Sequence, residues 1–146
     1  MPGMHETVLA FDFGLRRIGV AIGQQVTGSA NPLGAVANRA SGPDWNDIGR
    51  YVKEWRPACI VVGMPFHADG SRPEIADALD AFIDELARFG LPIETIDERH
   101  TSIEAEAILK AERATGIRGR ISKEMIDSMA AKLIAERWLR NRDRAG

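Results

Sequence analysis

Asp12 is the residue in this sequence whose type and position most clearly suggest chemistry. It ends the apolar run of residues 8–11 and is followed at once by Phe13 and Gly14. A carboxylate at the end of a buried strand is costly unless it has a partner. The nearby partners are a glycine-containing turn and two arginines, Arg16 and Arg17. This arrangement is typical of a site that holds a metal ion or a phosphate group.

Two further acidic residues could join Asp12. Glu98 follows the short strand predicted at residues 92–97, with Asp97 as its immediate alternative, and Asp127 borders the apolar stripe of the last predicted helix. An ordinary acidic residue in an early helical turn is the alternative for Asp127. Strand ends at one edge of an α/β sheet meet at a common crevice, so the three acids could converge.

Three carboxylates within a few ångströms repel one another, which raises their pKa values unless a cation neutralises them. A divalent cation is the simple remedy. Oxygen-only ligands favour Mg²⁺ or Mn²⁺, and no cluster of histidine and cysteine offers a zinc site. Two such ions bridged by a carboxylate can activate water and stabilise the leaving oxygen in phosphodiester hydrolysis.

Six other polar residues are candidates for contacts with a substrate: Arg17, His67, Asp69, Arg99, Arg120 and Lys123. Arg17 and Arg99 could contact phosphate or pair with the acidic cluster. His67 and Asp69 lie in a loop after a central apolar run, and this loop should open near the same crevice. Arg120 and Lys123 belong to a basic, glycine-containing segment that we expect to be mobile. A surface-loop histidine without a function is the alternative for His67.

The composition indicates a single soluble domain of 146 residues, in which residues 1–6 and 141–146 are expected to be mobile termini. No apolar run approaches the roughly 18–20 residues that span a membrane. The N-terminus does not resemble a signal peptide. Cys59, the one cysteine, lies in an apolar run and is expected to be a buried structural thiol. Together these features suggest the cytoplasm.

Charge is unevenly distributed along the chain, although the formal net charge is only −2. Residues 1–109 hold 9 Lys and Arg against 16 Asp and Glu, whereas residues 110–146 hold 10 against 5. The C-terminal quarter could therefore supply the basic face that a nucleic-acid protein needs. A solvated helix with a charged tail is an equally good interpretation of the charge alone.

Hydrophobic periodicity and turn signals predict strands and helices in a definite order. Strands are expected at residues 8–13, 17–22, within 28–37, at 58–63 and at 92–97. Helices are expected from Asp44 to just before Pro57, at 73–89, from Thr101 onward and at 122–139. Short turns make the first three strands antiparallel neighbours, and helical connections favour parallel pairing of the later ones. The result is an α/β fold: a mixed five-stranded sheet with helices on both faces.

Four segments make the sequence resemble the YqgF/RuvX family, the RuvC-like branch of the RNase H superfamily. They are "FDFGLRRIGVAIG" (11–23), "IVVGMPFHADG" (60–70), "DERHTSIEAEAIL" (97–109) and "KEMIDSMAAKLIAERWL" (123–139). The resemblance covers residues 7–140 and implies an RNase H-like fold. It implies acidic active-site residues at Asp12, Glu98 and Asp127, with Mg²⁺ or Mn²⁺ as cofactor. RuvC-type enzymes take an acid from the end of the fourth strand, where this chain has none, so here the acid is expected from the fifth.

The resemblance implies a metal-dependent nuclease that acts in maturation of the 5′ end of pre-16S rRNA. The expected partner is RNA, as pre-16S rRNA or a pre-ribosomal particle, and cleavage would leave 5′-phosphate and 3′-hydroxyl ends. One alternative is a Holliday junction resolvase that acts on branched DNA, which needs two active sites and hence a dimer. Another is a protein that binds nucleic acid or the ribosome without catalysis. The oligomeric state is left as a monomer or a weak homodimer.

Overall fold

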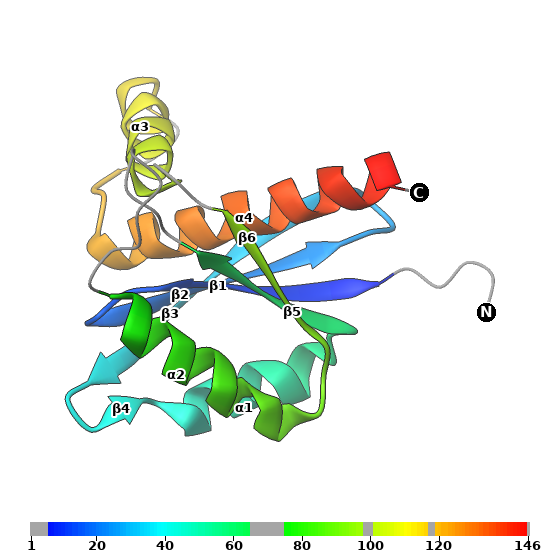
Figure 1. The fold of residues 1–146 in the computed structure, drawn as a ribbon. Helices are drawn as coiled ribbons and strands as arrows, with labels where there is room; N and C mark the ends of the chain where they lie inside the picture. Colours follow the sequence, from blue (N-terminus) through cyan, green and yellow to red (C-terminus); the bar gives the residue numbers. More distant parts are fainter. Residues whose placement is uncertain (1–5, 65–74, 98–100, 117–118, 146) are drawn as a thin grey trace.

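The computed structural model describes residues 6–64, 75–97, 101–116 and 119–145, with the side chains of 101–103 and 142–145 left aside. In this part of the chain a mixed sheet lies between two layers of helices (Figure 1). Helix α4 crosses one face of the sheet, and α1 and α2 cover the other. Helix α3 stands beside the N-terminal end of α4.

The sheet has the strand order β4-β3-β2-β1-β5-β6. Its strands are β1 (Thr7–Phe13), β2 (Arg17–Gln24), β3 (Ser29–Arg39), β4 (Gly42–Pro43), β5 (Cys59–Met64) and β6 (Ile93–Asp97). From β1 to β4, each strand pairs antiparallel with the next strand along the chain, whereas β5 runs parallel to both β1 and β6. The carboxyl ends of β1, β5 and β6 therefore lie at one edge of the sheet.

The helices are α1 (Trp45–Trp55), α2 (Ala76–Leu86), a 3-10 turn η1 (Ala87–Phe89), α3 (Thr101–Ala114) and α4 (Lys123–Ala145). Asp44 caps α1, because its side chain accepts a hydrogen bond from the backbone N–H of Asp47. The chain leaves α1 through Arg56, which adopts a left-handed backbone conformation directly before Pro57. Gly90 ends η1 in the same conformation, where glycine has no steric cost.

Side chains alternate between the two faces of β1 and so divide the core in two. Leu9, Phe11 and Phe13 belong to the larger apolar cluster, which includes residues of α1 and α2. Val8 and Ala10 belong to the other cluster, which α4 closes with residues such as Ile134 and Trp138. Asp12 continues the second series, so its side chain projects from the face that α4 covers.

The sequence-based fold is confirmed, with differences in detail. The sheet has a sixth strand, β4, whose two residues are too short for any periodic pattern. The predicted helix 73–89 divides into α2 and η1, and α4 continues six residues beyond the predicted end at Leu139. Cys59 is buried as expected.

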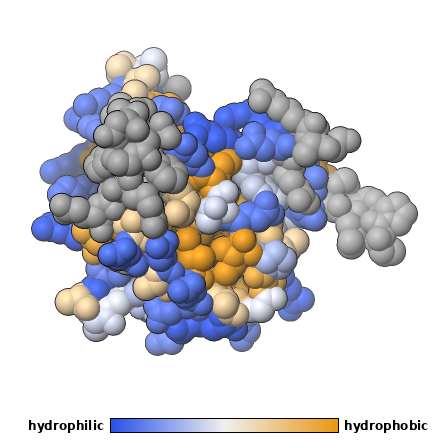
Figure 2. Space-filling model, viewed as in Figure 1, coloured by the Kyte–Doolittle hydropathy of each residue, from blue (hydrophilic) through white to orange (hydrophobic). Residues whose placement is uncertain are grey.

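On the face shown in Figure 2, much of the described surface is hydrophilic, and apolar surface gathers in the middle of the view, over the strands of the sheet. Strand β6 is an outermost strand of the sheet, and its residues are exposed or half-buried. The described helices include none that is long and apolar enough to cross a membrane.

Candidate active site

The site begins at Asp12, the sixth residue of β1. Its Cα lies opposite that of Gly19 in the antiparallel pairing of β1 with β2. The side chain follows Val8 and Ala10 on the face that packs against α4, and it is half-buried. The apolar residues of β1 thus fix the direction in which the carboxyl group points.

Asp127 is brought to the same place by a close approach of α4 to β2. A Cβ atom built on Gly19 would lie 2.0 Å from the backbone oxygen of Asp127, so only glycine allows this contact. About two turns further along α4, a Cβ on Gly23 would lie 3.3 Å from the Cβ of Ala135 and 2.8 Å from Val8 Cγ1. The small residues of β2 therefore form a track along which α4 lies unusually close to the sheet.

Arg17 completes the group from the first position of β2. Its Nε donates a hydrogen bond to Oδ2 of Asp127 over 2.6 Å, between residues 110 positions apart in the sequence. The two side chains are 29% and 22% exposed, so the ion pair is partly shielded from water. The hydrogen bond raises the pKa of the Arg17 guanidinium above its ordinary value, which keeps the arginine charged.

Among the described residues, no basic side chain pairs with the Asp12 carboxyl in this way. Burial raises the pKa of Asp12 from 3.8 to about 7, and the negative charge of Asp127 contributes in the same direction. A carboxyl that is difficult to ionise next to a second carboxylate is the electrostatic signature of a position where a cation is favourable. Within the described part of the chain, the packing of β1 holds this group in place and no hydrogen bond to the carboxyl does so.

The donor atoms of Asp12 and Asp127 fit a hard divalent cation, because both supply carboxylate oxygen. No group of three or more His, Cys, Asp or Glu side chains that could hold a metal ion occurs within the described residues. The third predicted acid, Glu98, lies outside those residues, as do His67, Asp69 and Arg99.

Asp97, the rival of Glu98, is the last residue of β6. Ile96 packs into the cluster that α4 closes, so the alternation of the strand directs the side chain of Asp97 to the opposite face from Asp12. The backbone oxygen of Asp97 instead accepts a hydrogen bond from Nη1 of Arg137 on α4, over 2.6 Å. This contact ties α4 to the end of β6 at the same edge of the sheet.

Two further predicted residues lie near the start of α4. Lys123 is its first residue, one turn before Asp127, and Arg120 lies three residues earlier; both are exposed. A lysine one turn from Asp127 on the same helix is available to solvent beside the site. Among the predicted residues that the structure describes, Asp12, Arg17 and Asp127 are the ones that it brings together.

Gly19 is the important residue that the sequence analysis missed. Its signal is the alternation of Arg17, Gly19, Ala21 and Gly23 along one face of β2, where every residue after the arginine is small. Such a strip indicates that another backbone approaches closely on that face.

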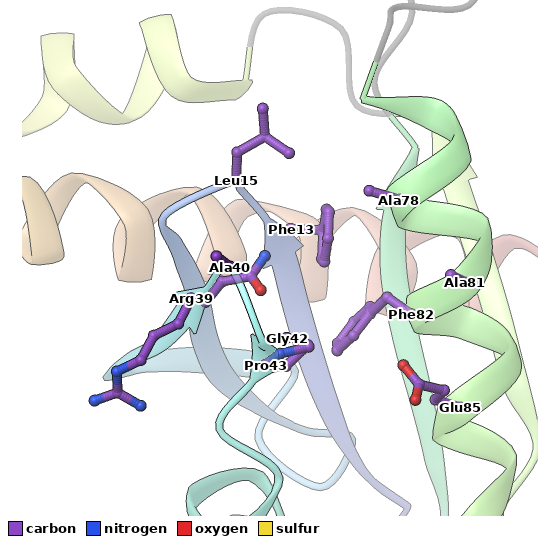
Figure 3. Close-up of a pocket in the computed structure, with 11 residues that line it drawn as sticks. Phe13, Leu15, Arg39, Ala40, Gly42, Pro43, Ala78, Ala81, Phe82 and Glu85 are labelled. Atoms are coloured by element: carbon purple, nitrogen blue, oxygen red, sulfur yellow. The ribbon is translucent and has the colours of Figure 1, made fainter.

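A separate pocket of about 380 Å³ opens on the other face of the sheet, between α2 and the loop that joins β3 to β4 (Figure 3). Leu15 and Phe13 point toward it from β1 and the turn that follows, and Phe82 lines it from α2. Among the described residues, Glu85 and Arg39 are the charged residues of its lining, so that lining has no pair of acidic side chains. The pocket lies across the sheet from Asp12 and Asp127.

Comparison with known sequences gives a match over almost the whole chain. A model of the RuvX family, described as Holliday junction resolvase, matches residues 6–141. A protein of Xanthomonas oryzae pv. oryzae named "Putative pre-16S rRNA nuclease" is 44% identical over 140 residues, which cover 95% of this chain and 90% of the relative. A protein of the same name from Azotobacter vinelandii is 41% identical over 136 residues, covering 92% and 94%.

Solved structures share the fold at much lower identity. The RuvC protein of T. thermophilus in complex with a Holliday junction substrate aligns with a TM-score of 0.56 and 19% identity, covering 97% of this chain and 98% of that one. The Fowlpox virus resolvase in complex with Holliday junction DNA aligns with a TM-score of 0.53 and 10% identity, covering 92% and 97%. These alignments place the mixed sheet and its helices in the RuvC-like, RNase H-type class.

Proposed function

This chain belongs to the RuvX family, and on that premise we propose that it is a divalent-metal-dependent nuclease that hydrolyses phosphodiester bonds in the 5′ leader of pre-16S rRNA. The observation that carries the proposal is the pair of acids, Asp12 and Asp127, held together at the edge of the sheet by the close packing of α4 on Gly19. The names of the relatives supply the substrate class.

Asp12 and Asp127 would hold Mg²⁺ or Mn²⁺, with Glu98 proposed as a third acid. The direction of the Asp97 side chain, away from Asp12, supports this choice over Asp97. When bound, the ion would supply Lewis-acid activation of water and of the scissile phosphate. The role of the chain is to keep two carboxylates side by side although they repel each other. Strand β1 does this for Asp12, and the contact between α4 and β2 does it for Asp127.

Cleavage of a labelled pre-16S 5′ leader RNA tests the proposal, with Mn²⁺, Mg²⁺ or EDTA, for the wild type and for Asp12→Asn. Asp84→Asn is the matched control, because Asp84 is exposed on α2 and the substitution changes the charge in the same way. We expect metal-dependent cleavage by the wild type and by Asp84→Asn, and none by Asp12→Asn. Full activity of Asp12→Asn would remove Asp12 from the mechanism.

A second candidate is resolution of Holliday junctions, favoured by the description of the family and by the RuvC-like fold. It would require two copies of the site at a fixed separation. A synthetic four-way junction run beside the RNA distinguishes the two. Paired, symmetric cuts in the junction by a dimeric protein would favour the resolvase, and cutting of the RNA alone would favour the processing nuclease.

A further inference from the structure

Among the described residues, the Arg17 side chain makes one polar contact, and that contact uses only part of its guanidinium group. Nε donates to Oδ2 of Asp127 over 2.6 Å. Within the described residues, neither Nη1 nor Nη2 of Arg17 has a hydrogen-bond partner, although the side chain is only 29% exposed. A guanidinium group carries five N–H donors, so four of them remain for water or for a ligand.

The unused donors have the geometry that binds phosphate. Nη1 and Nη2 form the end-on fork of the guanidinium plane, which matches two oxygens of a phosphate group. The bond from Nε fixes the plane of this fork, because Asp127 itself is fixed by the contact of its backbone with Gly19. An arginine already ordered in this way loses less conformational entropy when it binds a ligand.

The Asp127 carboxylate, which accepts the hydrogen bond from Arg17, also has one oxygen without a hydrogen bond among the described residues. Among the described residues, Oδ1 of Asp127 accepts no hydrogen bond, and Oδ2 accepts the one from Arg17. One oxygen can therefore ligate a cation while the other is held by the arginine, as is common where a carboxylate ligand is supported by a hydrogen bond from behind.

We propose that the Arg17 guanidinium group links the metal site to the substrate through two separate contacts. Its Nε positions Asp127, and its Nη1/Nη2 fork binds a phosphate of the substrate strand. This inference rests on the proposed nuclease function and specifies which group of the site receives the phosphodiester backbone. Arg16, the neighbouring arginine, is exposed, and its side chain makes no hydrogen bond or ion pair within the described residues.

The substitution Arg17→Lys tests the contact with Asp127 and the contact with phosphate separately. Lysine keeps the charge and can pair with Asp127, but an ammonium group engaged there has no fork left for phosphate. We expect Arg17→Lys to bind Mn²⁺ within about threefold of the wild type and to bind the RNA roughly tenfold more weakly, the loss expected for one charge-assisted hydrogen bond. Arg17→Gln should bind RNA more weakly, because it removes the charge as well as the fork, and it should bind Mn²⁺ more weakly, because Asp127 loses the hydrogen bond that positions it.

The measurements are isothermal titration with Mn²⁺ alone and fluorescence anisotropy with the labelled leader RNA in EDTA, where no cleavage occurs. Arg16→Gln is the matched control for loss of one charge and should leave Mn²⁺ affinity within about twofold of the wild type. Circular dichroism and the urea midpoint of each variant verify that it is folded.

Three results would overturn the proposal. Arg17→Lys that binds RNA as tightly as the wild type would show that the fork is not used. Arg17→Gln that binds Mn²⁺ more tightly than the wild type would mean that the arginine competes with the cation. An effect of Arg16→Gln on RNA binding as large as that of Arg17→Lys would remove the special role of Arg17. If the variants show the expected RNA affinities but the wild type does not cleave the RNA when Mn²⁺ is present, the nuclease function is refuted and the proposal that Arg17 binds phosphate stands.

Discussion

The Asp12 carboxyl should destabilise the metal-free protein increasingly as the pH rises, and Asp12→Asn should remove this cost. The pKa of Asp12 is about 7 in the folded protein, against an ordinary value of 3.8. Because the folded pKa is raised, the unfolded chain releases this proton first as the pH increases from about 4. The cost therefore grows between about pH 4 and pH 7 and is constant above that range.

The magnitude follows from the size of the shift. One pKa unit corresponds to about 1.4 kcal/mol, so a shift of about three units costs the ionised form about 4 kcal/mol as an upper limit for this half-buried group. At pH 5 the cost is about 1.5 kcal/mol, because most folded molecules still carry the proton. The free energy of unfolding of Asp12→Asn, relative to the wild type, should rise by up to about 2.5 kcal/mol between pH 5 and pH 8.

Urea unfolding followed by tryptophan fluorescence, in EDTA at pH 5 and pH 8, measures this difference. Asp84→Asn on the exposed side of α2 is the control, and its difference from the wild type should be nearly the same at the two pH values. The reasoning would be refuted if Asp12→Asn were less stable than the wild type at pH 8, or if its advantage did not increase with pH.

Two further predictions concern the contacts that assemble the site and the ion that it would hold. Gly19→Ala should lower the free energy of unfolding by at least about 2 kcal/mol in urea titration, because the new Cβ would lie 2.0 Å from the backbone oxygen of Asp127. Gly49 lies within α1, and a Cβ added there would meet Phe89 at 3.8 Å among the described residues. Gly49→Ala should therefore raise the free energy of unfolding by about 0.5–1 kcal/mol. Mn²⁺ at about one hundred times its Kd should stabilise the wild type at pH 8 by about 2.7 kcal/mol, with little effect on Asp12→Asn; equal stabilisation of both would place the ion elsewhere.

Much of the fold could be predicted from the sequence because its local signals agree with one another. The first two strands and the helix expected from Asp44 appear in the structure where their residue types suggested. The end of α4 was misplaced because the apolar stripe stops at Leu139. The following residues are polar but include no proline or glycine before Gly146, so nothing in them terminates a helix.

The site was less accessible to sequence reasoning, because it depends on contacts between distant residues. Spacing on the last helix predicted that Asp127 borders a buried face, but it could not show that Gly19 lies against its backbone or that Arg17 holds its Oδ2 atom. The roles of Glu98, His67, Asp69 and Arg99 stay predictions, since they lie outside the described residues.

The acidic pair is held together by packing that lies outside the pair. Asp12 and Asp127 repel each other, so the free energy that keeps them close must come from elsewhere. The nearest source is the apolar contact of α4 with β1 and β5, where Ala10, Val61 and Ile134 are fully buried. The track of small residues on β2 lets this contact form at short range. A substitution at Gly23 that pushes α4 outward near Ala135, about two turns from Asp127, should therefore separate the two carboxylates without touching either of them.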